Sequence, residues 1–163
     1  MTTIELAARA VTMGIAGSAA IDLWALSLRK AFDISSLDYR ILGRWLGHIP
    51  RGQIRHQRIA AAASVPGERV LGWLAHYGIG VGFAALLLLL AGDSWAESPT
   101  ILPALAVGLT TVLAPWLVMQ PAFGAGIAGS KTPHPWPGRL RNLGTHTVYG
   151  LGLYGSALVL AAL

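Results

Sequence analysis

Long stretches without a formal charge dominate this 163-residue chain. No Lys, Arg, Asp or Glu occurs in residues 70–92, 98–130 or 142–163, and a fourth apolar stretch, 10–28, is interrupted only by Asp22. A helix needs about 20 apolar residues to cross the roughly 30 Å hydrocarbon core of a bilayer. We therefore expect an all-α integral membrane protein with four transmembrane helices, at about 4–28, 70–92, 99–123 and 142–163.

The composition supports a membrane protein and excludes other classes. Hydrophobic residues make up 54% of the chain and charged residues only 12%, with a mean hydropathy of +0.57. A soluble domain usually carries about 25% charged residues. The absence of cysteine excludes disulfides, thiolate metal sites and iron–sulfur clusters. We expect a single transmembrane domain over residues 1–163.

The basic residues are confined almost entirely to two connections between the apolar stretches. Eight Lys and Arg residues lie in 29–69 and three lie in 124–141, whereas the turn near 93–97 has none. By the positive-inside rule, we expect both connections to face the cytoplasm and both termini to lie outside it. The expected partners are anionic lipid headgroups at the cytoplasmic face, and nucleic acid is not expected.

The connection 29–69 is too long for a simple turn and is expected to contain an amphipathic helix. Apolar and basic residues alternate at helical spacing over 37–46, with a cap expected in 33–36 and a second short helix in 53–64. Such a segment is typical of a collar lying on the bilayer surface, and a lid that binds a substrate or partner is the alternative. The residues expected to contact headgroups are Arg40, Arg44, Trp45, Arg51, Arg55 and Arg58.

Prolines and histidines near the basic face have ordinary structural interpretations. Pro115 and Pro121 are expected to kink the third span. The proline-rich stretch 131–138 is expected to be a loop that is not helical. The histidines expected to be solvated on this face are His48, His56 and His134.

Two segments resemble each other and predict an internal repeat. Aligned without gaps, 69–88 and 141–160 share nine identities in twenty positions, including Tyr77 with Tyr149. Two copies of a two-helix unit, related by an axis along the membrane normal, would produce this pattern. Chance similarity between two apolar helices is the alternative.

A few polar groups inside the apolar stretches are the candidates for function. Counting from the basic boundaries places Asp22, His76 and His146 at similar depths, about 7–11 Å from the cytoplasmic end. Rows of small residues at four-residue spacing lead to these groups, which predicts that they face other helices. The predicted polar layer consists of Asp22, His76, Gln120, His146, Tyr77 and Tyr149.

Three functions are compatible with this layer. The leading hypothesis is a transporter-like or permease-like protein in which Asp22 titrates within a path for protons or cations, with no cofactor required. The alternative is a metal- or haem-binding membrane protein or accessory subunit, with a divalent metal held by His76, His146 and Asp22, or a b-type haem between the two histidines. A structural or assembly protein is the third. No nucleotide-binding, zinc-protease or serine-triad signature is present, so no catalytic residue is expected.

A transport path through four short helices would favour a homodimer.

Several short motifs in chain order resemble one known family. They are SLDY at 36–39, GRWLGH at 43–48, PGER at 66–69, GW at 72–73, HY at 76–77 and MQPAFG at 119–124. With these motifs the chain resembles, along nearly its whole length, the bacterial family catalogued as domain of unknown function 2938. The resemblance implies a small multi-span protein of the inner membrane. It brings no established activity, so it assigns no site residue.

Overall fold

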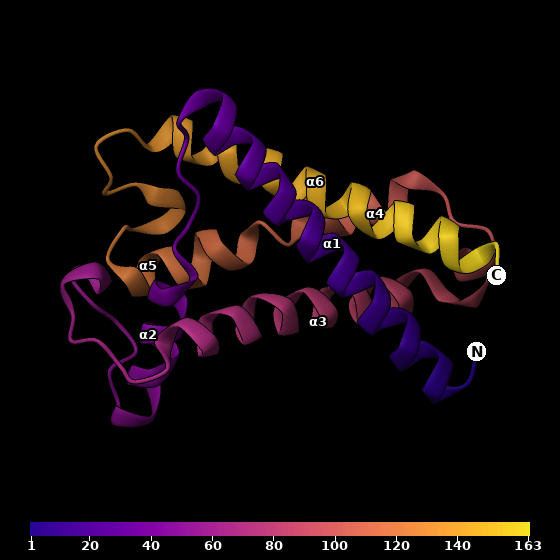
Figure 1. Ribbon diagram of the computed structural model, residues 1–163, viewed down its shortest axis with the longest axis horizontal. Helices are drawn as coiled ribbons and strands as arrows, with labels where there is room; N and C mark the ends of the chain where they lie inside the picture. Colours follow the sequence, from indigo (N-terminus) through magenta and orange to yellow (C-terminus); the bar gives the residue numbers. More distant parts are fainter. The chain divides into compact units, whose positions relative to one another are not determined.

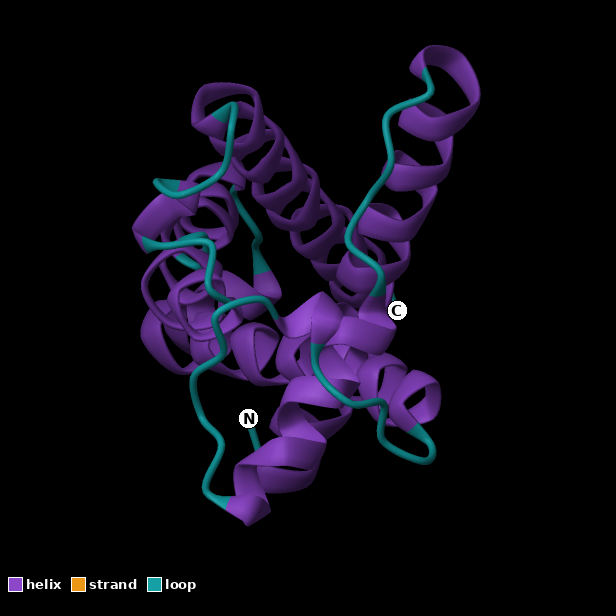
Figure 2. Ribbon diagram, turned by 90° about the vertical axis from the view of Figure 1, so that its left-hand side faces the viewer, coloured by secondary structure: helices purple, strands orange, loops and turns teal.

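The computed structural model describes all 163 residues and consists of helices and loops without β-strands (Figures 1 and 2). The all-α prediction is therefore confirmed. The helices are α1 (Thr3–Phe32), α2 (Tyr39–His48), α3 (Glu68–Glu97), α4 (Ile101–Thr110), α5 (Gln120–Phe123) and α6 (Pro135–Ala161). Single turns of 3₁₀ helix lie at Ile49–Arg51, Ile59–Ala61 and Ile127–Gly129, and a π-helical segment lies at Pro115–Met119.

Three helical stretches are long and apolar enough to cross a membrane, which indicates a membrane protein. They are Thr3–Phe32, Glu68–Glu97 and Ile101–Phe123. The fourth predicted span, 142–163, falls largely within α6, which is not among these three. The count of four spans and the internal repeat therefore stay predictions.

Local capping chemistry determines where α1 and α2 begin. The Thr2 hydroxyl accepts from the Glu5 amide while the Glu5 carboxylate accepts from the Thr2 amide, which forms a capping box before α1. The cap of α2 is Asp38, whose carboxylate accepts from the Arg40 amide at 3.0 Å. The prediction of a cap within 33–36 is wrong, because only a residue directly before the first helical turn can reach its free amides.

The backbone divides into two compact units, and each is described by itself. Unit 1 comprises residues 1–35, 77–111 and 144–163, and unit 2 comprises 36–76 and 112–143. Helices α3 and α6 contribute residues to both units. Charge is divided unevenly, since unit 2 holds nine Lys and Arg against two Asp and Glu, whereas unit 1 holds three against five.

Small residues bring α1 and the unit 1 part of α3 into close contact, as their four-residue rows predict. A methyl group added at Gly14 would lie 2.4 Å from the Cα of Val81, and one added at Gly80 would lie 2.2 Å from Ser18 Oγ. Gly14 therefore lies opposite Val81 and Ser18 lies opposite Gly80. The numbering rises along one helix as it falls along the other, so the two helices pack antiparallel.

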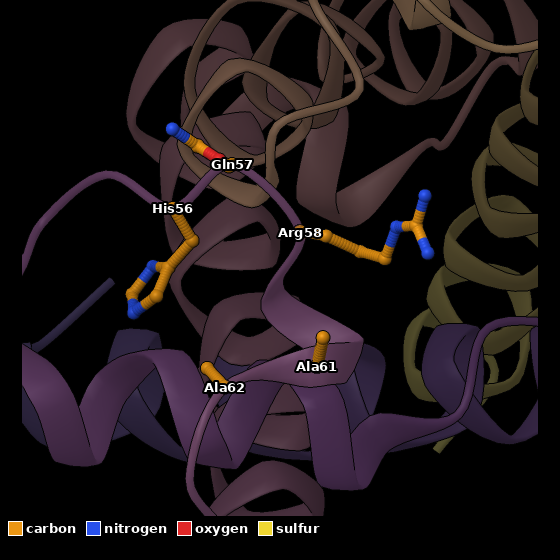
Figure 3. A pocket seen from close by; sticks show the side chains of 5 residues that line it. All are labelled: His56, Gln57, Arg58, Ala61 and Ala62. Atoms are coloured by element: carbon orange, nitrogen blue, oxygen red, sulfur yellow. The ribbon is translucent and has the colours of Figure 1, made fainter.

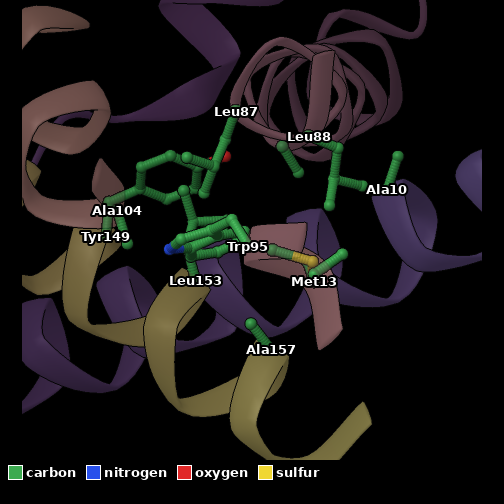
Figure 4. Packing of buried hydrophobic residues seen from close by; sticks show 11 residues of the cluster. Ala10, Met13, Leu87, Leu88, Trp95, Ala104, Tyr149, Leu153 and Ala157 are labelled. Carbon is green, nitrogen blue, oxygen red and sulfur yellow. The ribbon is translucent and has the colours of Figure 1, made fainter. Parts of the chain in front are cut away.

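Helix α6 makes the same kind of contact with α1 and α4. Figure 1 shows α1 crossing α6, and a methyl group added at Gly152 would lie 2.8 Å from the Cα of Gly17. One added at Gly108 would lie 2.7 Å from the Cα of Gly150. These contacts surround an apolar core, part of which is shown in Figure 4. Its fully enclosed large apolar side chains are Met13, Leu87, Leu88 and Leu153.

Unit 2 is organised around Arg44 of α2. The guanidinium donates from Nε and Nη2 to the two carboxylate oxygens of Glu68, each at 2.8 Å. Its Nη1 donates to the carbonyl oxygens of Ala60 and Ala62, both at 3.1 Å. The Arg44 and Glu68 side chains are only 15% and 14% exposed, so this two-pronged ion pair is largely withdrawn from solvent. One side chain thus ties α2 to the start of α3 and to the loop 52–67.

That loop does not contain the predicted second helix. Residues 53–64 include only a single 3₁₀ turn. Their main-chain groups bind neighbouring segments instead, since the His56 amide donates to the Ala122 carbonyl and the Ile54 carbonyl accepts from Trp45 Nε1, both at 2.8 Å. Tertiary contacts therefore override the local helical pattern.

Prolines shape two further stretches of unit 2. Helix α6 begins at Pro135, so the prediction of a loop over 131–138 is wrong at its end. Proline is compatible with a first helical turn, because the amides there have no partner within the helix. Pro115 begins the π-helical segment, in which the Gln120 amide donates to the Pro115 carbonyl. The kinks expected at Pro115 and Pro121 stay predictions.

Candidate functional site

The acid within the first apolar stretch meets a tyrosine of unit 1. The Tyr77 hydroxyl on α3 donates to Asp22 Oδ2 on α1 at 2.9 Å. The pair lies one helical turn beyond the contact between Ser18 and Gly80, so the close packing there aligns the two side chains. Both helices are candidate membrane spans and both side chains are partly buried. An ionisable group held between two such helices is a functional-site candidate by default.

His146 anchors α6 on α4. Its Nδ1 lies 2.9 Å from Thr111 Oγ1 and 3.2 Å from the Gly108 carbonyl oxygen, and Thr111 donates to that same carbonyl at 2.6 Å. Because the threonine hydrogen points to Gly108, we assign the imidazole proton to Nδ1, which donates to both oxygens. Nε2 then carries the lone pair of the neutral ring.

Tyr149 connects α6 to α3 at the point where both approach α1. Its hydroxyl donates to the Gly80 carbonyl, and a methyl group added at Gly17 would lie 2.7 Å from its ring. Tyr77 and Tyr149, which the predicted repeat aligns, therefore have chemically different partners, a carboxylate and a main-chain oxygen.

His76 belongs to an aromatic cluster of unit 2. Its ring stacks on Tyr39, with ring centroids 4.1 Å apart and planes 20° from parallel. The Trp73 ring packs edge-on against both, with its centroid 4.8 Å from that of Tyr39 and 6.0 Å from that of His76. The histidine is thus positioned by π-stacking between α2 and the start of α3.

Gln120 lies in a polar network that the sequence did not predict. With the Asn142 amide turned so that its oxygen faces the donors, that oxygen accepts from Gln120 Nε2 at 2.7 Å and Trp116 Nε1 at 3.0 Å. The Asn142 nitrogen then donates to the Gly138 carbonyl at 3.3 Å. Gln120 Oε1 is buried without a hydrogen-bond partner. The network joins the π-helical segment to the start of α6.

The predicted polar layer is therefore distributed over both units. Unit 2 contains His76 and Gln120, and unit 1 contains Asp22, Tyr77, His146 and Tyr149. No group of three or more His, Cys, Asp or Glu side chains that could hold a metal ion is present. The metal and haem alternatives therefore stay predictions, because His76 belongs to one unit and Asp22 and His146 belong to the other.

The residues predicted to contact lipid headgroups have different surroundings. Arg44 and Trp45 bind groups within unit 2, as described above. Arg40 forms an ion pair with Asp38, and this hydrogen-bonded guanidinium holds the pKa of the Asp38 carboxyl below its usual range. The residues that are exposed and available to headgroups are Arg51, Arg55 and Arg58.

His48 and His56 form a pair, which corrects the prediction that both are solvated. His48 is 3% exposed, and its Nδ1 lies 2.8 Å from Nε2 of His56, with the two rings stacked. Each ring supplies the hydrogen-bond partner that the other needs, so burial leaves these two nitrogens satisfied. Nδ1 of His56 is buried without a partner. His134 is exposed, as predicted.

An open cavity of about 520 Å³ lies beside this histidine pair. It is lined by His56, Gln57, Arg58, Ala61 and Ala62 (Figure 3). The imidazole of His56 and the guanidinium of Arg58 leave the loop on opposite sides. No pattern in the sequence predicts this cavity, because its walls come from a loop without periodicity.

Comparison with known proteins places the chain in a family. No curated protein and no solved structure matches it. One family model matches residues 11–160, nearly the whole chain, which confirms the resemblance seen in the short motifs. The chain therefore belongs to the family described as "Protein of unknown function (DUF2938)".

Proposed function

We propose that this chain is a small transporter of the bacterial inner membrane, in which Asp22 and Tyr77 form the group that binds and releases a proton. The observation that carries the proposal is the 2.9 Å hydrogen bond from the Tyr77 hydroxyl to the Asp22 carboxylate. It joins two helices that are each long and apolar enough to cross a membrane.

The chemistry of the pair suits a group that changes protonation state. A carboxylate within a membrane helix is costly and is typically retained where it serves an ion pathway. A tyrosine hydroxyl can donate to a carboxylate and can accept from a carboxylic acid, so Tyr77 can bind both forms of Asp22. The pair can therefore release a proton without losing its helix contact.

The orientation in the membrane is part of the proposal. We place four spans across the bilayer, with the connections 29–69 and 124–141 in the cytoplasm and both termini outside. The concentration of nine Lys and Arg residues in unit 2 supports this orientation, because such residues are enriched in cytoplasmic segments.

The test is proton flux through the purified full-length protein in lipid vesicles. The vesicles contain a pH-sensitive dye, and a potassium gradient with valinomycin makes their interior negative. Wild-type vesicles should acidify faster than protein-free vesicles. Asp22→Asn should reduce the rate to the protein-free level, because an amide cannot take up the proton. Tyr77→Phe should slow the flux without abolishing it.

The matched control is Asp33→Asn, which makes the same chemical change at the end of α1. Asn tolerates the left-handed φ of 53° that Asp33 adopts, so this variant should retain the wild-type rate. Wild-type flux no faster than that of protein-free vesicles, or an unchanged rate in Asp22→Asn, would overturn the proposal. In either case the Asp22–Tyr77 contact would be structural.

A further inference from the structure

We infer that the cavity lined by His56, Gln57, Arg58, Ala61 and Ala62 binds a phosphate-class anion, provided by a phospholipid headgroup or by a free phosphate compound. The inference does not depend on the transport proposal. The cavity lies entirely within unit 2. Its volume of about 520 Å³ falls within the range of small-molecule sites, about 300–1,000 Å³.

The loop that forms the cavity is fixed in place despite its lack of regular structure. The His56 amide donates to the Ala122 carbonyl at 2.8 Å, and the adjoining His48–His56 contact holds the same segment on α2. Gly124, with φ of 91°, passes so close that a methyl group there would lie 2.0 Å from the Gln57 carbonyl oxygen. A ligand therefore meets walls that are already ordered, which lowers the entropic cost of binding.

The charge around the cavity favours an anion. Unit 2 has only two carboxylates among its nine basic residues, and both are already bound, Asp38 by Arg40 and Glu68 by Arg44. Arg58 lines the cavity and forms no ion pair. Its guanidinium can donate two parallel hydrogen bonds to a phosphate, the geometry for which arginine is preferred.

Two carbonyl oxygens of the cavity wall are occupied. Carbonyl oxygens along a loop would repel an anion, but that of Ala62 accepts from Arg44 Nη1 and that of Arg58 accepts from the Ala61 amide, both at 3.1 Å. Nδ1 of His56 is enclosed by protein, so this nitrogen presents no lone pair to an anion in the cavity.

The test measures thermal stabilisation of the full-length protein in a non-ionic detergent. Inorganic phosphate and a short-chain phosphatidylglycerol are titrated separately, at constant ionic strength and against a chloride reference. Arg58→Gln should weaken the apparent affinity for the better ligand about tenfold, which corresponds to the loss of one charge-assisted contact. Ala61→Phe, which fills the cavity without changing charge, should weaken it by a similar factor.

The matched control is Arg69→Gln, which removes an exposed charge of unit 2 outside the cavity. It should change the affinity by less than about twofold, because a charge outside the cavity does not contact the bound anion and salt screens its longer-range attraction. Saturation at a lower concentration of phosphatidylglycerol than of phosphate would identify the headgroup as the source, and the reverse order would identify a free phosphate compound. The inference is overturned if neither probe stabilises the protein, or if Arg69→Gln and Arg58→Gln have equal effects.

Discussion

Tyr149 donates its hydroxyl to the carbonyl oxygen of Gly80 at 2.6 Å, so a side chain of α6 binds the main chain of α3. Tyr149 is only 3% exposed, and a buried tyrosine hydroxyl normally requires such a partner. The contact determines how α6 is rotated about its axis, because the ring must also lie over Gly17 of α1.

Tyr149→Phe should destabilise the protein while preserving its packing. The phenylalanine ring fills the same space but loses the buried hydrogen bond, so the free energy of unfolding should fall by about 1–2 kcal/mol. Unfolding in detergent micelles measures the change. Tyr154→Phe is the matched control, because the Tyr154 hydroxyl makes no hydrogen bond in unit 1, and equal losses in the two variants would contradict the assignment.

Gly14→Ala should destabilise the protein by forcing α1 away from α3 at their closest contact. The added methyl group would lie 2.4 Å from the Cα of Val81, and a main-chain atom cannot rotate away as a side chain can. Overpacking of this kind costs about 1–3 kcal/mol, and the thermal unfolding midpoint should fall accordingly. Gly82→Ala on α3 has nothing within 4 Å of the added methyl and should be neutral. The packing argument fails if the two variants have the same midpoint.

Arg44→Lys should loosen the loop 52–67 although it retains the charge. Lysine cannot bind both Glu68 oxygens and two carbonyls in the planar geometry that arginine provides. The free energy of unfolding should fall by about 2–4 kcal/mol, and amide hydrogen exchange should accelerate in the loop. Arg40→Lys, at an exposed pair, should leave the loop protection unchanged. Protection that survives Arg44→Lys would show that Arg44 does not hold the loop.

The sequence predicted the helices better than the contacts between their polar groups. Uncharged apolar runs located α1 and α3, because a segment of that length and composition can satisfy its main chain only as a helix in a membrane. The row from Gly14 through Ser18 to Asp22 also predicted which face of α1 meets another helix. Small residues are required there because the two main chains nearly touch.

Partners could not be predicted because they depend on how the helices align. Asp22 meets Tyr77 only because Gly14 packs on Val81, a contact between main chains that no residue pattern encodes. Thr111 and Asn142, the partners of His146 and Gln120, are single neutral residues without periodicity. Asn142 is the one asparagine in the chain, and this rarity was the feature of the sequence that could have pointed to the polar network around Gln120.

The π-helical segment at Pro115–Met119 has a consequence for changes in chain length. Its wide turn accommodates one additional residue without rotating the helix that follows. A deletion within α3 would instead turn every later side chain of that helix by about 100°. A homologous chain could therefore lack one residue between Pro115 and Met119 while the residues after it keep their facing toward Asn142. A change of chain length by one residue thus disturbs the structure least at this turn.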